Sequence, residues 1–133
     1  MRFRWSIFFL ILLGAVVFVG QPGLDLDERQ GLYEPVEFTV AGDANEIVPP
    51  GLEIRDGRLS FFNGCNFGAG TIDLRGNTLR LDDFLRDAIG CPEDYVPSTV
   101  GTLIAAEPNV TFSNEGLLVL TDGDRVLTMQ LVD

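Results

Sequence analysis

Histidine and lysine, two residue types that often carry chemistry or bind nucleic acid, are both missing from this sequence. Without histidine, a nucleophilic thiol lacks the base that normally activates it. A zinc site would have to complete a pair of thiolates with carboxylates, because imidazole ligands are missing. The sequence therefore argues against thiol catalysis and zinc binding, and it predicts no bound metal and no cofactor.

Basic residues are scarce in general. Arg2 and Arg4 precede a hydrophobic run, so the rest of the chain carries seven arginines against 20 acidic residues, and the net charge of −11 becomes −13 without those two. Such an acidic surface repels phosphate backbones, which excludes a nucleic-acid partner. Two interpretations of the charge stay open: it keeps the protein soluble, also in a salty medium, or it attracts a cationic partner or calcium.

Cysteine is limited to Cys65 and Cys91, which are 26 positions apart. The spacing is not the C-x-x-C of a redox pair. An even cysteine count in an exported domain favours a disulfide, which would stabilise this loop by about 3–4 kcal/mol on the chain-entropy account. Free buried thiols are the alternative.

The first part of the chain has the composition of a targeting segment. Residues 1–21 are interpreted as a signal anchor or a signal peptide, because two arginines precede the apolar run of residues 5–20. Small residues suited to cleavage are poorly placed, whereas the run is short of the roughly 20 residues that span a bilayer. Either interpretation attaches or exports the protein and places it in the cell envelope, outside the cytoplasmic membrane. Residues 22–31 are then a linker, and residues 32–133 form one domain.

Alternation of apolar and polar residues dominates this domain. Residues 36–40 alternate, with Val36, Phe38 and Val40 on one side. Further alternating runs flank the dipeptides Asp56-Gly57 and Gly76-Asn77, and two more hairpins are predicted between residues 110 and 131. Such dipeptides between alternating runs are strong hairpin signals. The pattern predicts a series of antiparallel strands.

The alternation stops between residues 82 and 109. Asp82 is expected to cap a short turn that contains Phe84, Leu85 and Ile89. Residues 98–106 then suit a helix with Ser98 as N-cap. We therefore expect a mainly β, α+β fold: an antiparallel, partly closed, barrel-like sheet interrupted by one helix and preceded by an N-terminal hydrophobic helix.

Several short motifs together resemble the META domain, the family of HslJ-like bacterial envelope proteins. The shared positions are Gly64, Cys65 and Asn66, then Cys91 and Pro92, and in the closing hairpin Gly116, Leu118, Leu120 and Gly123. The resemblance covers roughly residues 50–132. It implies a β-rich, barrel-like fold with a helix in exported or membrane-linked proteins that are connected with stress or envelope upkeep. It implies no settled catalytic activity.

The Gly-Cys-Asn motif is expected to be structural. Gly64 permits a backbone conformation that is closed to other residues, and Asn66 tolerates a left-handed conformation or bonds its own backbone. Cys65 can then point toward Cys91 and tie a hairpin to the crossover before the helix. As an alternative, this turn lines a ligand site, with Asn63, Asn66 and Phe67 as contacts.

These observations favour a non-enzymatic module that binds an envelope protein or a small apolar ligand. The alternative is a hydrolase or thiol-dependent enzyme that uses surface carboxylates or Cys65. Asp82, Asp83 and Asp87 cluster in the sequence, but a solvated acidic face is the usual outcome, and no catalytic pair can be picked out among so many acids. A cleft with two close carboxylates would favour the enzyme, whereas an apolar groove would favour the binding module.

Overall fold

The computed structural model describes residues 26–87 and 90–133. The signal segment of residues 1–21, its expected hydrophobic helix and Ile89 lie outside these residues. Within the described ranges, no helix combines the length and the apolar character needed to cross a membrane.

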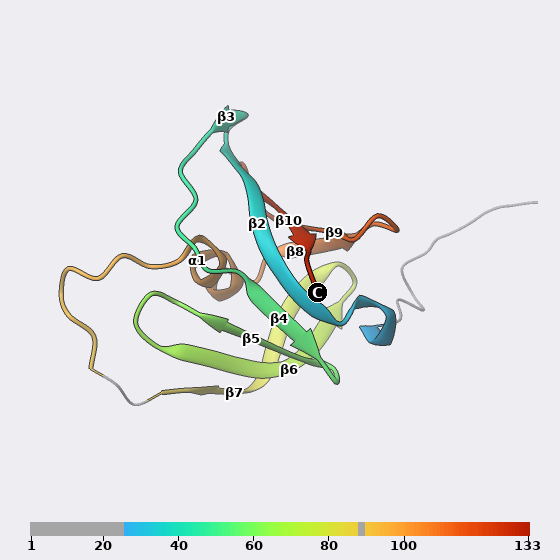
Figure 1. Ribbon diagram of the computed structural model, residues 1–133, viewed down its shortest axis with the longest axis horizontal. Coiled ribbons are helices and arrows are strands. Elements are labelled where there is room, and N and C mark those ends of the chain that lie inside the picture. The colour runs from blue at the N-terminus through green and yellow to red at the C-terminus, as the bar shows by residue number, and fades with distance from the viewer. Residues whose placement is uncertain (1–25, 88–89) are drawn as a thin grey trace, which may run out of the picture.

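The described chain is a succession of strands with one α-helix (Figure 1). The elements in chain order are η1, a 3₁₀ turn (Leu26–Arg29), β2 (Gly31–Val40), β3 (Asp43–Ala44), β4 (Leu52–Arg55), β5 (Arg58–Phe62), β6 (Phe67–Arg75), β7 (Thr78–Arg86), α1 (Thr99–Ala105), β8 (Asn109–Phe112), β9 (Leu117–Asp122) and β10 (Arg125–Leu131).

All strand pairings are antiparallel and they join into a closed ring. The order is β10-β9-β8-β7-β6-β5-β4-β2, with β3 attached to β2, and β10 pairs with β2 to complete the circuit. The weakest junction lies between β7 and β8, which share only the Thr78–Asn109 pair in the register. The expected antiparallel sheet with one helix is confirmed for the described residues, and its two ends meet.

Short turns set the register of the hairpins. Asp56 and Gly57 both have positive φ (55° and 76°), the combination that a type I′ turn requires. Gly76 starts the turn between β6 and β7 with φ 63°. Because these turns hold the register, the alternating apolar residues Leu52 and Ile54 of β4 and Leu59 and Phe61 of β5 are buried, as the alternation predicts.

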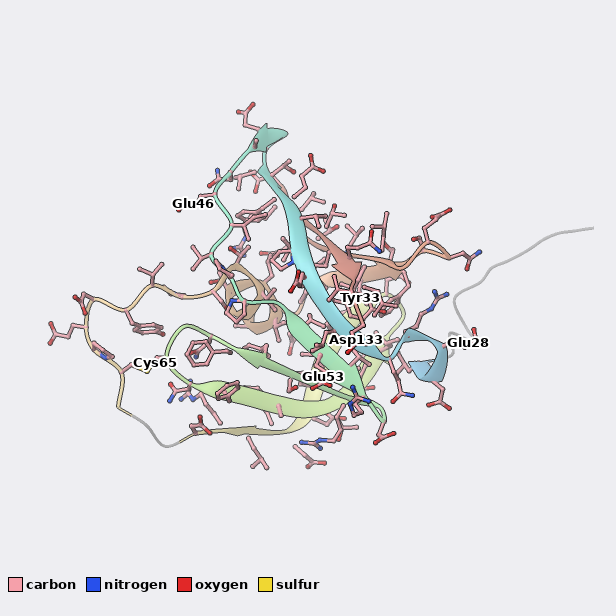
Figure 2. The ribbon with its side chains drawn as sticks, viewed as in Figure 1. Glu28, Tyr33, Glu46, Glu53, Cys65 and Asp133 are labelled. Atoms are coloured by element: carbon pink, nitrogen blue, oxygen red, sulfur yellow. A yellow bond between two sulfur atoms is a disulfide. The ribbon has the colours of Figure 1, made fainter. Side chains whose placement is uncertain are left out.

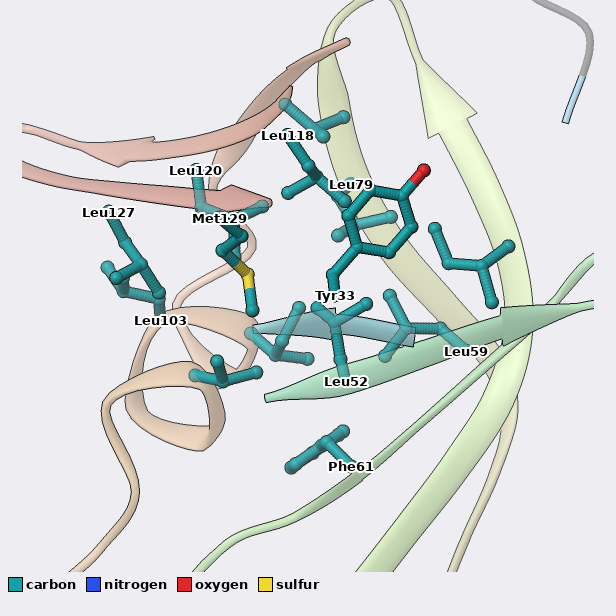
Figure 3. Close-up of a cluster of buried hydrophobic side chains, with 14 residues drawn as sticks. Tyr33, Leu52, Leu59, Phe61, Leu79, Leu103, Leu118, Leu120, Leu127 and Met129 are labelled. Carbon is teal, nitrogen blue, oxygen red and sulfur yellow. The ribbon is translucent and has the colours of Figure 1, made fainter. Parts of the chain in front are cut away.

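One apolar core fills the ring (Figure 3). Leu103 of α1 points into the interior with Leu127 and Met129 of β10, and all three side chains are fully buried. The helix thus supplies core residues that the strands alone would lack. The remaining buried apolar residues are Tyr33, Leu52, Ile54, Leu59, Phe61, Leu79, Val100, Ile104, Val110, Leu118 and Leu120.

The expected inward face of residues 36–40 is wrong at its first position, because Val36 is 56% exposed. In the pairing with β10, Thr128 lies opposite Glu37 and Met129 lies opposite Pro35, so Val36 is the extra residue of a β-bulge. A bulge interrupts the two-residue period of side-chain direction. Tyr33, before the bulge, is the buried aromatic residue of β2.

The turn expected after Asp82 is also wrong. Strand β7 runs through Phe84 and Leu85 to Arg86 and pairs with β6 along this length. A second bulge, where Asp83 has φ 51°, shifts the alternation of apolar and polar residues. The sequence of β7 therefore lacks the regular two-residue period of a strand. Gly70, opposite this bulge, allows the close approach, because a Cβ there would lie 2.8 Å from Cβ of Leu81.

The helix prediction is confirmed. Ser98 is the N-cap of α1, and its hydroxyl accepts a hydrogen bond from the Gly101 N–H at 2.9 Å. The helix ends before Pro108, which is buried and accepts a hydrogen bond from the Leu79 N–H.

The described end of the predicted linker, residues 26–31, packs against the domain. Arg29 donates a hydrogen bond from Nη1 to the Ser113 carbonyl at 2.9 Å, and its guanidinium lies over the Phe112 ring at 5.6 Å. Tyr33 donates its hydroxyl hydrogen to the Arg29 carbonyl at 2.7 Å. These contacts fix the short η1 turn on the β8–β9 hairpin, and Gly31 already belongs to β2.

Two apolar residues on the strands that close the ring, Leu127 on β10 and Val36 on β2, are expected to contribute very differently to the free energy of unfolding. Leu127→Ala is expected to lower the free energy of unfolding by about 2–5 kcal/mol, because it opens a cavity at a fully buried site. Val36→Ala, at the exposed bulge, is expected to change it by about 0.5 kcal/mol or less. Urea unfolding followed by circular dichroism measures both. A large loss at Val36 would contradict the bulge.

Candidate functional site

The turn that joins β5 to β6 is built by Asn63. Its Oδ1 accepts hydrogen bonds from the backbone N–H groups of Cys65 (2.9 Å) and Asn66 (2.7 Å). The Asn63 N–H in turn donates to the Asn66 carbonyl at 2.8 Å. Side-chain bonds of this kind replace the backbone ladder where a strand ends. One asparagine therefore holds the whole turn.

Gly64 occupies a backbone position that other residues cannot use. Its φ is 107°, and a Cβ atom at this position would lie 2.3 Å from the carbonyl oxygen of Val96. The role expected for Gly64 is thus confirmed, and the close contact brings residues 96–97 against the turn.

Cys65 and Cys91 form a disulfide, with their Cα atoms 5.7 Å apart. Figure 2 shows Cys65 at the end of the β5–β6 hairpin, and its partner lies in the crossover from β7 to α1. The predicted link between hairpin and crossover is confirmed. In this state Cys65 has no thiol to act as a nucleophile. Pro92, the next motif residue, is exposed and accepts a bond from the Tyr95 N–H at 3.3 Å.

Asn66 has a different role from the one expected. Asn66 is 4% exposed, and its φ is not positive, so it does not have the left-handed conformation. Its Nδ2 donates to the Asp87 carbonyl at 3.4 Å, while its Oδ1 lies 2.9 Å from Sγ of Cys91, which carries no hydrogen in the disulfide. The left-handed conformation belongs to Gly64 and the local bonds belong to Asn63, so Asn66 connects the turn to the crossover.

The same turn positions the helix. The Ser98 N–H donates to the Asn63 carbonyl at 2.9 Å, and a Cβ on Gly101 would lie 3.0 Å from Cβ of Asn63. On the other side, Thr99 and Val48 exchange two hydrogen bonds, from the Val48 N–H to Oγ1 and from the Thr99 N–H to the carbonyl. The first turn of α1 is therefore fixed on both sides.

A groove of about 230 Å³ lies between α1 and the sheet of β5, β6 and β7. Its apolar lining comes from Phe61, Leu81, Phe84 and Ile104. The Phe61 and Phe84 rings stack with centroids 6.2 Å apart. Gly68 makes room for them, because a Cβ there would lie 2.7 Å from the Phe84 ring.

Three polar residues complete the groove lining. Asn63 contributes at the end near the turn, and Arg86 and Glu107 are both exposed. The Glu107 carboxylate lies 3.6 Å from Nε of Arg80. Glu107 is the one carboxylate among the lining residues, so the groove does not bring together the carboxylate pair that a hydrolase needs. Its shape and lining suit an apolar group with a polar end.

The carboxylates singled out in the sequence do not line this groove. Asp87 accepts a hydrogen bond at Oδ2 from the Phe67 N–H at 3.2 Å, and Asp82 and Asp83 lie in β7 near the bulge. In the part of the chain that the structure describes, no three histidine, cysteine or acidic side chains form a group that could hold a metal ion.

The three ligand contacts predicted from sequence do not line one cavity. Asn63 lines the groove, whereas Asn66, to which it is hydrogen-bonded, is 4% exposed and does not line it. Phe67 is 61% exposed and lies outside the groove. Sequence reasoning missed Phe84 and Arg86. The signal that could have found them is their shared spacing on β7, which becomes readable only once the bulge at Asp83 is known.

Comparison with known proteins identifies the fold. The family model of the META domain matches residues 28–133. A solved structure, the NMR structure of a protein from Burkholderia xenovorans, is similar with a TM-score of 0.51 and 18% sequence identity, over 77% of this chain and 82% of that chain. At this identity the likeness concerns the fold alone. Among curated proteins the chain finds no match.

The turn geometry leads to a prediction for Gly64. Gly64→Ala combines a disfavoured φ with a clash against the Val96 carbonyl, which belongs to the backbone and cannot rotate away. Gly57→Ala is the matched control, since Gly57 also has a positive φ (76°) but a Cβ atom added there would have no other atom within 4 Å. The control is expected to lower the free energy of unfolding by about 1–2 kcal/mol from backbone strain alone. Gly64→Ala is expected to lower it by more than that in the same urea titration. Equal losses would contradict the close packing of residues 96–97 on the turn.

Proposed function

The chain belongs to the META domain family, and on that premise we propose that it is a non-enzymatic binding module that holds an apolar group in the groove between α1 and β7. The observation that carries this proposal is the groove itself. Four apolar side chains from strands β5 and β7 and from the helix surround it, and Asn63, Arg86 and Glu107 are placed to orient a polar end. A small apolar ligand, or an apolar side chain of an envelope protein, fits this chemistry.

We further propose that the domain acts outside the cytoplasmic membrane, either anchored through residues 5–20 or secreted. The charge pattern of residues 1–21 supports this location. The disulfide supports it as well, because such bonds persist in oxidising compartments. A part in envelope maintenance or in a stress response is consistent with the family resemblance.

The alternative of a hydrolase or thiol-dependent enzyme receives less support. A hydrolase would need a second carboxylate beside Glu107 in the groove, and the lining offers Asn63 and Arg86 instead. A thiol enzyme would need Cys65 in a reduced form, whereas it is paired with Cys91. The binding proposal therefore uses the groove as it is built.

Filling the groove tests the proposal. Ala105 is exposed and lines the groove at the end of α1, so Ala105→Trp is expected to occupy the space without disturbing the core. The apolar fluorescent probe 1-anilinonaphthalene-8-sulfonate is expected to bind the wild-type protein saturably and to bind this variant at least about tenfold more weakly, a difference of about 1.4 kcal/mol.

Ala106→Trp is the matched control, because Ala106 is also exposed but does not line the groove. It is expected to bind the probe like the wild-type protein. Thermal unfolding of both variants establishes that they are folded. Equal probe binding by the two variants would contradict the assignment of the groove.

Localisation leads to a separate prediction. In cells that express the full chain, the domain is expected in the membrane fraction or the external medium, with a mass two hydrogens below that of the reduced protein. Intact mass spectrometry without reductant reports both the disulfide and any removal of residues 1–21. Recovery from the cell interior with two alkylatable thiols would contradict the proposed location.

A further inference from the structure

A second hollow, called the outer hollow, is lined by residues of β2, β4, β5 and β6 and by none of α1. It has a volume of about 280 Å³, and the residues that matter for its chemistry are Leu32, Glu34, Pro50, Glu53, Phe62 and Phe67. Phe61 lines both this hollow and the groove between α1 and β7, whereas the other residues of the hollow do not line that groove. The two cavities therefore share Phe61 and otherwise offer different residues to a ligand.

The hollow exists because β4 is shorter than its neighbours. Strand β2 pairs with β4 as far as Tyr33–Leu52, and β4 pairs with β5 as far as Leu52–Phe61. At Gly51 the chain passes so close to β2 that a Cβ would lie 1.8 Å from the Tyr33 carbonyl oxygen. Beyond this point β2 and β5 continue without a strand between them, and the gap is open to solvent.

Exposed apolar side chains line this gap. Phe67 is 61% exposed and Leu32 is 42% exposed. Phe62 faces Phe67 across the β5–β6 pair, with ring centroids 5.0 Å apart and planes tilted by 54°. An apolar hollow with two adjacent aromatic rings at the surface is typical of a contact site.

The charged residues that line the hollow are Glu34 and Glu53. Glu53 is already paired with Arg55 at 2.7 Å, so Glu34 is the lining carboxylate for which the described residues show no ion pair. Figure 2 shows Glu53 on β4, and this residue is among those that line the hollow. A cation at this place would be attracted by the carboxylates, and the aromatic faces of Phe62 and Phe67 favour a guanidinium or ammonium group.

We propose that this outer hollow binds a segment of a partner protein in which basic side chains alternate with apolar ones. The apolar side chains enter the hollow against Leu32, Phe62 and Phe67, and a basic side chain faces Glu34 beside the Glu53–Arg55 pair. A second copy of this chain does not fit, because it brings the same carboxylates and the same negative net charge. An anionic lipid surface is repelled for the same reason.

The test uses a short synthetic peptide of alternating leucine and arginine, titrated into the full-length protein by calorimetry. The same peptide with glutamate in place of arginine is the first control. We expect the leucine–arginine peptide to bind at least about tenfold more tightly than the glutamate peptide, with an affinity that falls as salt is added.

Two pairs of matched variants locate the peptide. Phe67→Ser removes an exposed aromatic side chain from the hollow, and Val36→Ser removes an exposed apolar side chain outside it. Glu34→Gln and Glu37→Gln form the corresponding pair of exposed carboxylates on β2. We expect Phe67→Ser to weaken binding by about tenfold or more and Glu34→Gln by several-fold with a weaker salt dependence, while the two controls bind like the wild-type protein.

Three results would overturn the inference. The glutamate peptide binds equally well, or Phe67→Ser binds like Val36→Ser, or sedimentation shows that the protein forms a dimer that Phe67→Ser abolishes. Ala105→Trp separates this inference from the proposed function. If this variant alone fails to bind the peptide, the peptide binds in the α1–β7 groove and the outer site is overturned, while the groove keeps its proposed role.

Discussion

The turn held by Asn63 and locked by the Cys65–Cys91 bond is the constraint on which the rest of the structure depends. The ring of strands is weakest between β7 and β8, and α1 lies between these two strands in the chain. A helix of seven residues has little stability of its own, so its position must come from tertiary contacts. Ser98 bonds to the turn, and the disulfide holds the crossover that leads to the helix. Without these links the core would lose Leu103 and its neighbours.

The two hollows share strand β5 and differ in the charges that line them. On β5, Phe61 lines both hollows, whereas Phe62 lines the outer hollow and not the groove. The groove beside α1 contains one cation and one carboxylate, Arg86 and Glu107. The charged residues that line the outer hollow are Glu34 and Glu53. The two proposed sites therefore differ in charge, and a single domain has room for both.

The sequence was sufficient to predict those parts of the structure that depend on neighbouring residues along the chain. The Asp56-Gly57 turn, the Ser98 cap and the alternation of β4 and β5 all follow from local geometry. It failed at Val36 and Phe84, where a bulge moves side chains to the other face. A bulge arises from the register between two strands that are distant in sequence, and a pattern within one strand does not contain that register.

For the candidate sites the division is the same. The motif Gly64-Cys65-Asn66 and the spaced Cys91 determined a tight turn and a disulfide, because φ preference and cysteine count are properties of the residues themselves. Which side chains surround a groove was decided only by the tertiary structure. Leu81 and Ile104 line one groove because the fold places β7 and α1 on opposite sides of it. The outer hollow opens because β4 begins at Leu52, opposite Tyr33, whereas β2 continues to Val40. Concave surfaces depend on how elements of unequal length are placed in space, and that placement is a property of the whole fold.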